Sequence, residues 1–238
     1  MPKVLVSDAL SETAVNIFKD RGIEVDYQPT LGKDKEKLLS IIGDYDGLAV
    51  RSATKAMAPV IAAGKNLKVI GRAGIGVDNI DIPAATAAGV VVMNTPFGNA
   101  ITTAEHAIAM IFSLVRKIPQ ANQSTHSGKW EKSAFMGAEV TGKTIGIIGC
   151  GNIGAIVANR AIGLKMRVVA FDPFLTAERA IEIGVEKVDL DTLLERADIV
   201  TLHTPLTEQT KNILNAENIA KLKPEAFIVN CARGGLVD

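Results

Sequence analysis

The chain has 238 residues, and its 26 Lys and Arg residues are balanced by 26 Asp and Glu residues. A formal net charge of zero argues against a nucleic-acid-binding module, which normally carries a basic excess. Hydrophobic residues make up 47% of the chain, which excludes wholesale disorder, while aromatic residues make up only 4%. The largely aliphatic core that results favours parallel strands covered by helices on both faces.

The sequence also excludes several cellular settings. The longest apolar run, from Ala107 to Val115, is far shorter than the roughly 18 residues of a membrane helix. The amino terminus runs straight into a strand-like segment, so we expect no secretory signal peptide. Cys150 and Cys231 cannot build a disulfide framework, and no Cys/His cluster has the spacing of a zinc site. The sequence predicts a cytoplasmic protein without a metal and without nucleic acid or membrane partners.

Short β-branched runs alternate with helix-like stretches through the first third of the chain. The expected strands are residues 4–6, 23–25, 48–50, 69–70 and 90–92, and the expected helices are 12–20, 34–42, 57–63 and 82–88. The regular spacing of the strands is typical of repeated βα units. This alternation predicts a parallel sheet with right-handed crossovers.

A break in this pattern predicts the domain boundary. Pro96 and Gly98 interrupt the βα alternation, which suggests a crossing between domains. A helix over 102–117 follows, and its apolar residues fall on more than one face, so we expect it to be buried under its own domain or against another subunit. His106 lies within this helix and is expected to pack there. The polar residues 120–139 are expected to form an irregular arm.

The βα pattern restarts at residue 144. The expected strands are 145–148, 168–171, 199–202 and 227–230, with a weak one at 185–188, and the expected helices are 153–164, 177–183, 192–196 and 217–221. The fold class predicted is α/β, with two Rossmann-like or flavodoxin-like parallel-sheet domains and a cleft between them. We expect the domains to span residues 1–97 and 98–238.

The most specific motif is a glycine-rich loop between a strand and a helix. It contains Gly149, Gly151 and Gly154 in the GxGxxG spacing of a dinucleotide fingerprint. Gly149 is expected to permit the tight turn, Gly151 to let the pyrophosphate approach the backbone, and Gly154 to bring the helix close to the strand. The amide groups at the start of the helix then bind the anion.

A carboxylate closes the next expected strand. Asp172 lies 23 residues beyond Gly149, where an acidic residue accepts hydrogen bonds from the adenosine ribose. A carboxylate there repels the 2′-phosphate of NADP, and no Arg or Lys lies between Asp172 and Arg179 to bind that phosphate. The sequence therefore predicts NAD as the cofactor. The competing interpretation is an ordinary glycine turn followed by a surface Asp.

Further polar residues follow other expected strands. Arg51, Arg72, His203 and Arg233 each lie where a strand ends, and ligands of open α/β sheets bind outside the carboxyl ends of strands. Three arginines facing one cleft suit an anionic substrate, because guanidinium binds carboxylate or phosphate in bidentate fashion. A solvated surface charge is the alternative for any single arginine, and the glycines beside Arg72 and Arg233 weaken it.

Together these motifs resemble the D-isomer-specific 2-hydroxyacid dehydrogenase family. The likeness covers essentially the whole chain, and the motifs stand in the family's order. The segments that carry it are 71–81, 94–96, 149–154, 203–207 and 230–238. Four segments, 50–55, 94–99, 128–130 and 230–233, point within the family to a member that oxidises a phosphorylated 2-hydroxy acid with NAD in serine biosynthesis.

The resemblance implies a role for each matching residue. Arg233 matches the catalytic arginine that orients the substrate carboxylate and polarises the carbonyl. The NAD-contacting positions implied are Ile75, Gly149, Gly151, Asn152, Ile153, Gly154, Asp172, His203, Thr204, Cys231 and Ala232. The substrate-binding positions implied are Arg51, Arg72, Gly74 and Asn99, with Lys132 on the arm as added positive charge for the phosphate, in its own or the neighbouring subunit. The long helix and the arm match the family's dimer contact, which implies a homodimer or homotetramer.

One departure concerns the catalytic proton. The family pairs its arginine with a Glu–His dyad in which the histidine is the general acid and base. Both residues lie beyond the Val-Asp pair at Val237 and Asp238. His203 is placed on the cofactor side, so we expect the catalytic Glu and His to be missing. We also expect the nucleotide half to be incomplete at its carboxyl end, because its strands are short of the six in the Rossmann order.

Four functions remain open at this point, and the least specific of them is a Rossmann domain that acts on another ligand altogether. The first is the NAD-dependent oxidation of a phosphorylated 2-hydroxy acid. The second is the reduction of glyoxylate, hydroxypyruvate or another 2-oxo acid, since such enzymes share every motif except the bias toward phosphate. The third is an NAD-responsive binding module without catalysis, a class known on this fold among transcriptional corepressors.

Overall fold

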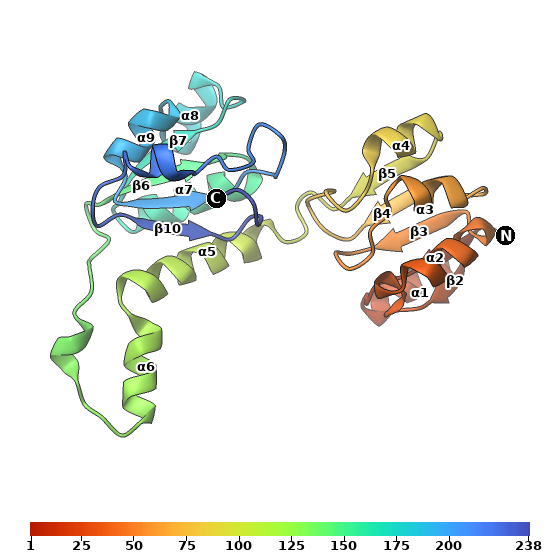
Figure 1. Ribbon diagram of the computed structural model, residues 1–238, viewed down its shortest axis with the longest axis horizontal. Helices are drawn as coiled ribbons and strands as arrows, with labels where there is room; N and C mark the ends of the chain where they lie inside the picture. Colours follow the sequence, from red (N-terminus) through yellow and green to blue (C-terminus); the bar gives the residue numbers. More distant parts are fainter. The chain divides into compact units, whose positions relative to one another are not determined.

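The computed structural model describes residues 1–238 and divides into two compact units, Met1–Asn99 and Ala100–Asp238. This division falls slightly beyond the expected boundary between residues 97 and 98. Each unit is built around one five-stranded sheet with helices beside it (Figure 1). Every strand pair in both sheets is parallel, which confirms the predicted α/β class.

The first unit has the strand order β2-β1-β3-β4-β5. This order reverses between β1 and β3, which makes the carboxyl ends of those two strands the switch point of the sheet. The strands are β1 (Lys3–Val6), β2 (Glu24–Tyr27), β3 (Gly47–Val50), β4 (Val69–Arg72) and β5 (Val91–Asn94). The helices are α1 (Glu12–Asp20), α2 (Lys35–Ile41), α3 (Ala58–Ala63) and α4 (Ile82–Ala87), with short 3₁₀ turns η1 (Leu31–Lys33) and η2 (Ile42–Asp44).

The core of the first unit lies on both faces of its sheet. All four residues of β3 are buried, as expected for a central parallel strand. Leu5, Leu48 and Ile70 belong to the larger cluster, which the helices α2, α3 and α4 complete. Val4, Val6 and Ala49 form a smaller cluster on the opposite face with side chains from α1 and β2. Burial on two faces fixes the strand ends that carry the loops of this unit.

The second unit has the strand order β10-β9-β6-β7-β8. This is a Rossmann arrangement, and its order reverses between β6 and β9. The strands are β6 (Thr144–Ile148), β7 (Arg167–Phe171), β8 (Glu186–Lys187), β9 (Ile199–Leu202) and β10 (Phe227–Asn230). The helices are α5 (Ala100–Val115), α6 (Ile118–His126), α7 (Asn152–Gly163), α8 (Ala177–Ile183), α9 (Leu190–Arg196) and α10 (Ala216–Ile219), with the 3₁₀ turn η3 (Lys132–Phe135).

The arm differs from the sequence expectation, because it begins with a helix. The structure has α6 over Ile118–His126, where residues 120–139 were expected to be irregular throughout. Pro119 lies in the first turn of α6, a position where its missing amide hydrogen would have no partner in any case. Lys117 turns the chain between α5 and α6 with a left-handed φ of 52°. The proline therefore starts a new helix here.

Helix α5 buries one face and exposes the other. Ala104, Ala107 and Ile111 pack into the core of the second unit, whereas Met110 and Leu114 are 44% and 42% exposed. His106 is exposed, so the expectation that its side chain is packed is wrong. The core of the second unit covers only one face of α5, and His106 lies outside that face. None of the helices, α5 included, combines the length and the apolarity that crossing a membrane requires.

Candidate functional site

The fingerprint loop joins β6 to α7, and each of its glycines meets a different steric demand. Gly149 has a φ of 90°, and a Cβ there would lie 2.8 Å from the backbone of His203 and Thr204. A Cβ on Gly154 would overlap the carbonyl oxygen of Gly149. A Cβ on Gly151 would meet no atom within 4 Å. The protein itself therefore requires the first and third glycines, while the second leaves open space at the start of α7.

Asp172 follows β7 and contacts the same loop. One carboxylate oxygen accepts a hydrogen bond from the Cys150 amide at 2.8 Å, and the other accepts one from the Phe174 amide at 2.8 Å. Burial, together with the Asp172 carboxylate, raises the pKa of the Cys150 thiol to about 11. Cys150 is thus a thiol packed under the loop, and Asp172 fixes the loop against the end of β7.

His203 follows β9, directly beside the fingerprint loop. Its Nε2 is 2.9 Å from the hydroxyl oxygen of Thr201, while its Nδ1 is buried without a hydrogen-bond partner. Burial lowers the pKa of His203 to about 4, so the imidazole is neutral near pH 7. A neutral, enclosed ring suits the expected position beside the cofactor and makes His203 a poor proton acceptor. Thr204, next to it, is half-buried.

The predicted catalytic arginine lies in a loop that an asparagine holds. Cys231, Ala232 and Arg233 are half-buried residues directly after β10. The side-chain Nδ2 of Asn230 donates to the backbone carbonyl of Arg233 at 2.8 Å, and the side-chain Oδ1 of Asn230 accepts from the backbone amide of Ala232 at 3.0 Å. Farther along, the Leu214 amide donates to the Leu236 carbonyl at 3.1 Å. The arginine loop is therefore tied down on both sides.

In the first unit, Arg51 directly follows β3 and Arg72 ends the adjacent strand β4, but the two residues differ in exposure. Arg51 is exposed, and its guanidinium donates to the Ala9 carbonyl at 3.3 Å. Arg72 is only 9% exposed. Its Nε donates to the Arg51 carbonyl at 3.2 Å, and its Nη1 contacts the Gly76 carbonyl and the Asp78 carboxylate. Arg72 organises the loop around it, and its contact with a substrate stays a prediction.

The remaining predicted residues are spread over both units. Gly74 and Ile75 are tied to the end of β5, since their carbonyls accept hydrogen bonds from the Thr95 amide at 3.1 Å and the Asn94 side chain at 2.7 Å. Asn99 is exposed at the end of the first unit. Asn152 and Ile153 are the first residues of α7. Lys132 is exposed on η3, in the arm that follows α6.

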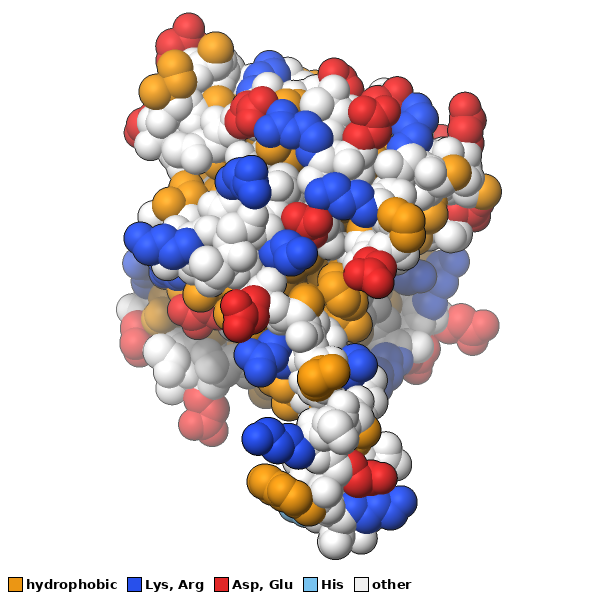
Figure 2. Space-filling model, turned by 90° about the vertical axis from the view of Figure 1, so that its left-hand side faces the viewer, with side chains coloured by type: hydrophobic (Ala, Val, Ile, Leu, Met, Phe, Trp, Pro, Cys, Tyr) orange, Lys and Arg blue, Asp and Glu red, His pale blue; other side chains and the backbone are white.

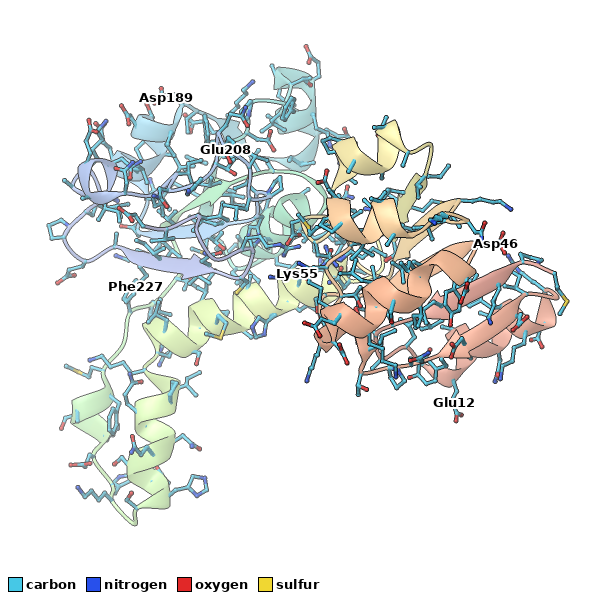
Figure 3. All side chains as sticks on the ribbon, turned by 45° about the vertical axis from the view of Figure 1, so that its right-hand side comes forward. Glu12, Asp46, Lys55, Asp189, Glu208 and Phe227 are labelled. Atoms are coloured by element: carbon cyan, nitrogen blue, oxygen red, sulfur yellow. The ribbon has the colours of Figure 1, made fainter.

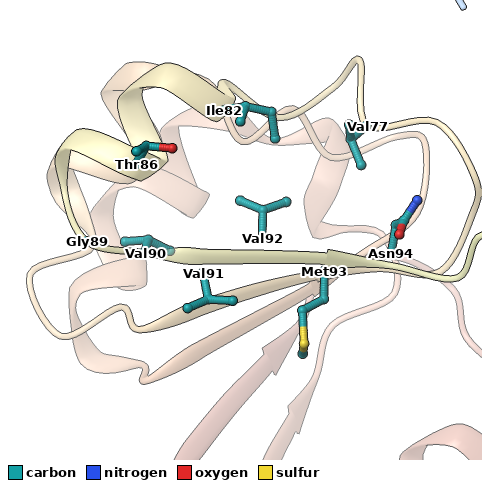
Figure 4. A pocket seen from close by; sticks show the side chains of 9 residues that line it. All are labelled: Val77, Ile82, Thr86, Gly89, Val90, Val91, Val92, Met93 and Asn94. Atoms are coloured by element: carbon teal, nitrogen blue, oxygen red, sulfur yellow. The ribbon is translucent and has the colours of Figure 1, made fainter.

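Two surface hollows bear on where ligands bind. The first runs along β5 at the edge of the first sheet, with Val92 pointing toward α4 and Val91 and Met93 pointing away from it (Figure 4). None of the predicted site residues lines this groove. The second hollow lies beside β7 and β8 and includes Asp172 together with Pro173, Asp189 and Arg196. Only the second therefore touches the predicted cofactor site.

Three residues of these loops were missed in the sequence. Asp8 and Asn79 are buried side chains that hold the segment bearing Arg51, and Asn230 holds the segment bearing Arg233. A signal existed for two of them, since Asp8 lies just past β1 and Asn230 ends β10, both at carboxyl ends of strands. Asn79 follows no strand directly, and its one signal in the sequence is its place in the 71–81 segment that carries the family resemblance.

The second unit fits NAD on its own geometry. Gly151 leaves open space at the amino end of the twelve-residue helix α7, and no side chain caps that end. A helix start of this kind binds a pyrophosphate through its amide groups. Asp172 stands at the end of the neighbouring strand β7, and a carboxylate in this place is the usual acceptor for ribose hydroxyls in dinucleotide-binding folds. These are the groups that a dinucleotide of this class requires.

Comparisons with known proteins agree with this geometry. Residues 108–238 match the family model described as D-isomer specific 2-hydroxyacid dehydrogenase, NAD binding domain. The whole chain is 49% identical to a D-3-phosphoglycerate dehydrogenase of Synechocystis sp. and covers 42% of that protein. Over 236 residues, 99% of this chain, it is 50% identical to a D-3-phosphoglycerate dehydrogenase of Archaeoglobus fulgidus and covers 44% of it. The chain thus spans less than half the length of these curated relatives.

A solved structure gives the same result for the fold. A glyoxylate reductase from Paecilomyes thermophila superposes with a TM-score of 0.90 at 30% identity, over 100% of this chain and 75% of that one. The fingerprint, the carboxylate after β7 and the arginine loop after β10 all lie within residues 108–238, which the family model matches. The chain therefore belongs to the D-isomer specific 2-hydroxyacid dehydrogenase family, and its second unit carries that family's NAD binding domain.

Proposed function

We propose that the protein oxidises D-3-phosphoglycerate to 3-phosphooxypyruvate with NAD, the first step of the phosphorylated route to L-serine. The observation that carries this proposal is the identity of 49% and 50%, along the whole chain, with two D-3-phosphoglycerate dehydrogenases. The neutral overall charge is compatible with a small anionic substrate, because the arginines needed for it lie at the carboxyl ends of β3, β4 and β10.

Arg233 is the residue we assign to the reacting end of the substrate. A guanidinium binds the carboxylate in bidentate fashion and polarises the adjoining C2–O bond. Asn230 fixes the loop in which Arg233 lies, through hydrogen bonds of 2.8 Å and 3.0 Å. When bound, NAD accepts the hydride that leaves C2. The hydroxyl proton needs a base other than His203, whose lowered pKa makes the imidazole too weakly basic.

Arg51 is the residue we assign to the phosphate end. It is exposed at the carboxyl end of β3, where an anion can reach its guanidinium. Asn99 and Lys132 are further candidates, and Lys132 would act from the arm, in its own or the neighbouring subunit. Arg72 supports Arg51 through the bond from its Nε to the Arg51 carbonyl at 3.2 Å.

We also propose that the protein forms homodimers or homotetramers through α5 and the arm. The residues that support this are exposed apolar side chains on α5, α6 and the segment after them, and Figure 2 shows hydrophobic side chains on the projecting arm. They are Ile101, Met110, Leu114, Ile118, Trp130 and Met136. Exposed apolar surface of this extent marks an interaction site more often than a solvated face.

The oligomer can be tested with exposed residues whose replacement spares the core. Met110→Glu combined with Leu114→Glu is expected to shift the sedimentation coefficient of the complete gene product to that of a monomer. Ile181→Glu is the control, because Ile181 is 81% exposed on α8, outside the arm. An oligomer unchanged by the double substitution would refute this interface.

The reaction itself can be tested with a substrate panel. We expect the complete gene product to form NADH from D-3-phosphoglycerate with a higher kcat/KM than from glycerate or D-lactate. We expect the same kcat/KM to exceed that for the reduction of glyoxylate or hydroxypyruvate with NADH. A preference for glyoxylate would favour the alternative reductase, which the structural similarity to a glyoxylate reductase supports. Tight NAD binding without any turnover would point to a non-catalytic binding module. We place the reaction in the cytoplasm, since both cysteines are free thiols.

A further inference from the structure

The segment from Arg51 to Thr54 is held at both ends by two buried polar side chains. Asp8 lies just past β1 and is 3% exposed, and Asn79 is 7% exposed. The strand order of this unit reverses between β1 and β3, so this segment leaves the sheet at the switch point, next to Asp8. In Figure 3, Lys55 marks the end of the sheet to which the segment belongs, and Asp46 marks the opposite end.

Asp8 takes the amide hydrogens of this segment. Its Oδ2 accepts from the Arg51 amide at 2.6 Å and from the Thr54 amide at 3.1 Å. Its Oδ1 accepts from the Thr54 hydroxyl at 2.9 Å. Because an ionised carboxylate only accepts, the Thr54 hydroxyl spends its hydrogen on Asp8, and the Ser7 hydroxyl donates in the 2.7 Å contact with Thr54.

Asn79 serves the carbonyl groups of the same two residues. Its Nδ2 donates to the Arg51 carbonyl at 2.7 Å and to the Thr54 carbonyl at 2.7 Å. Asp8 and Asn79 thus form a clamp, in which Asp8 holds the backbone amides of the segment and Asn79 holds its backbone carbonyls. Gly32 packs closely against Thr54 and Asp8, since a Cβ at Gly32 would lie 2.7 Å from the Thr54 amide nitrogen.

Burying the Asp8 carboxylate lowers the stability of the fold, so stability alone does not explain its presence. A carboxylate removed from water loses strong solvation, and its partners here are neutral amides and a hydroxyl. An apolar side chain after β1 would avoid that cost but would leave two amides without acceptors. What the carboxylate secures is one fixed conformation for the segment that begins with Arg51. The guanidinium of Arg51 also donates a hydrogen bond to the carbonyl of Ala9, the residue after Asp8, at 3.3 Å.

We propose that Asp8 and Asn79 are positioning residues for the anionic end of the substrate, because together they hold the backbone from which Arg51 reaches it. This role rests on the proposed function of Arg51. Neither side chain needs to touch the substrate. The effect of losing either should therefore appear in substrate affinity, with little change in NAD affinity, since the fingerprint loop and Asp172 belong to the second unit.

The decisive comparison uses two replacements of Asp8 in the complete gene product. In Asp8→Asn the amide oxygen can still accept from both backbone amides, because a single oxygen takes both in the native structure. In Asp8→Ala both amides lose their acceptor. We expect Asp8→Ala to raise the KM for D-3-phosphoglycerate at least about tenfold and Asp8→Asn less than about threefold. The kcat and the dissociation constant for NAD should stay within about threefold in both variants.

A matched control lies at the other end of the same sheet. The carboxylate of Asp46 also accepts from a backbone amide, that of Lys3 at 2.9 Å, and pairs with Lys68 at 2.8 Å. Asp46→Ala is expected to lower the unfolding temperature and leave the KM unchanged. If Asp8→Ala does not fold, Asn79→Ser removes the other half of the clamp and should give the same rise in KM. Hydrogen exchange of the Arg51 and Thr54 amides should be slow in the wild type and faster in either clamp variant.

Each result decides the proposal. A rise in KM for Asp8→Ala that Asp8→Asn largely rescues, with NAD affinity retained, supports the clamp. Equal losses in Asp8→Asn and Asp8→Ala would assign the effect to charge and overturn it, and so would an unchanged KM in an active protein. If the wild type neither binds nor oxidises D-3-phosphoglycerate, the proposed function falls, and this role falls with it. An active wild type with unaffected variants refutes the clamp alone.

Discussion

The carboxylate of Asp172 accepts a hydrogen bond from the backbone amide of Cys150 at 2.8 Å. This bond joins the end of β7 to the fingerprint loop after β6, so the group expected to receive the ribose and the loop expected to receive the pyrophosphate are held in one geometry. The second oxygen accepts from the Phe174 amide at 2.8 Å. A carboxylate oxygen accepts more than one hydrogen bond, which leaves capacity for the ribose hydroxyls.

Removing this carboxylate is expected to change cofactor choice. Asp172→Ala loses the acceptor for the ribose hydroxyls and the charge that repels a 2′-phosphate, so NAD affinity should fall about 10- to 100-fold and discrimination against NADP should relax. Asp189→Ala is the control, because Asp189 lines the same hollow but caps α9 by accepting from the Thr192 amide. Calorimetric titration of each variant with NAD and NADP measures both effects. An unchanged ratio of the two affinities in Asp172→Ala would contradict the ribose assignment.

Two glycines of the fingerprint should respond differently to the same substitution. Gly154→Ala places a Cβ against the carbonyl oxygen of Gly149 and should destabilise the second unit by about 1–3 kcal/mol. Gly151→Ala meets no protein atom within 4 Å, so stability should be preserved while the methyl group obstructs the pyrophosphate. Urea unfolding and NAD titration of both variants separate the two effects. Equal stability of the two variants would be inconsistent with the close packing described for Gly154.

The buried imidazole of His203 makes the stability of the second unit depend on pH. Its pKa is lowered from 6.5 to about 4 by burial, so the unfolded chain binds the proton first as the pH falls. The stability that a neutral His203 preserves is present above pH 6.5 and is lost between pH 6.5 and 4, by at most about 3 kcal/mol.

Replacing the ring isolates this contribution from that of the carboxylates. In His203→Gln, urea unfolding measured from pH 4 to 7 should show a shallower loss of stability than in the wild type. His126→Gln, at an exposed histidine on α6, should follow the wild type throughout. A His203→Gln curve parallel to that of the wild type would show that the ring titrates normally in the folded protein.

The Cys150 thiol should resist alkylation. Its pKa is raised from 9.0 to about 11 by burial and by the Asp172 carboxylate, so its thiolate fraction at pH 8 is about 100-fold below that of an ordinary thiol. Burial also raises the pKa of Cys231, but this residue is less enclosed and should react first. Cys231→Ala should abolish the faster phase of reaction with a disulfide reagent. A Cys150 that reacts as fast as Cys231 would mean that the loop is open in solution.

Local patterns were enough to predict the family, the NAD cofactor and the two parallel sheets. Strand, glycine turn and helix are adjacent in sequence, so the roles of Gly149 and Gly154 follow from their spacing, and the structure gives each the expected steric reason. Asp189 shows the limit of this approach. It caps α9, which begins at Leu190, two residues before the expected start at 192, because a side-chain cap extends the helix in a way that the hydrophobic pattern does not reveal.

Features that depend on contacts distant in sequence could not be predicted. Arg72 was expected to face solvent or substrate, yet it is buried, because carbonyls of the loop around it and of Arg51, one strand away, use its donors. The clamp on Arg51 joins Asp8 and Asn79 from segments far apart in the chain. The arm was expected to be irregular, whereas the left-handed turn at Lys117, with Pro119 in the first turn that follows, starts the helix α6 there.

Transfer of deuterium tests the proposed reaction most directly. The complete gene product would be incubated with NAD and D-3-phosphoglycerate deuterated at C2, and the mass of the NADH formed would be measured by mass spectrometry. We predict NADH that carries one deuterium, together with stoichiometric 3-phosphooxypyruvate, and a loss of this product in Arg233→Gln without loss of NAD binding. Unlabelled NADH, or no NADH despite tight NAD binding, would contradict the assignment of this protein as a D-3-phosphoglycerate dehydrogenase.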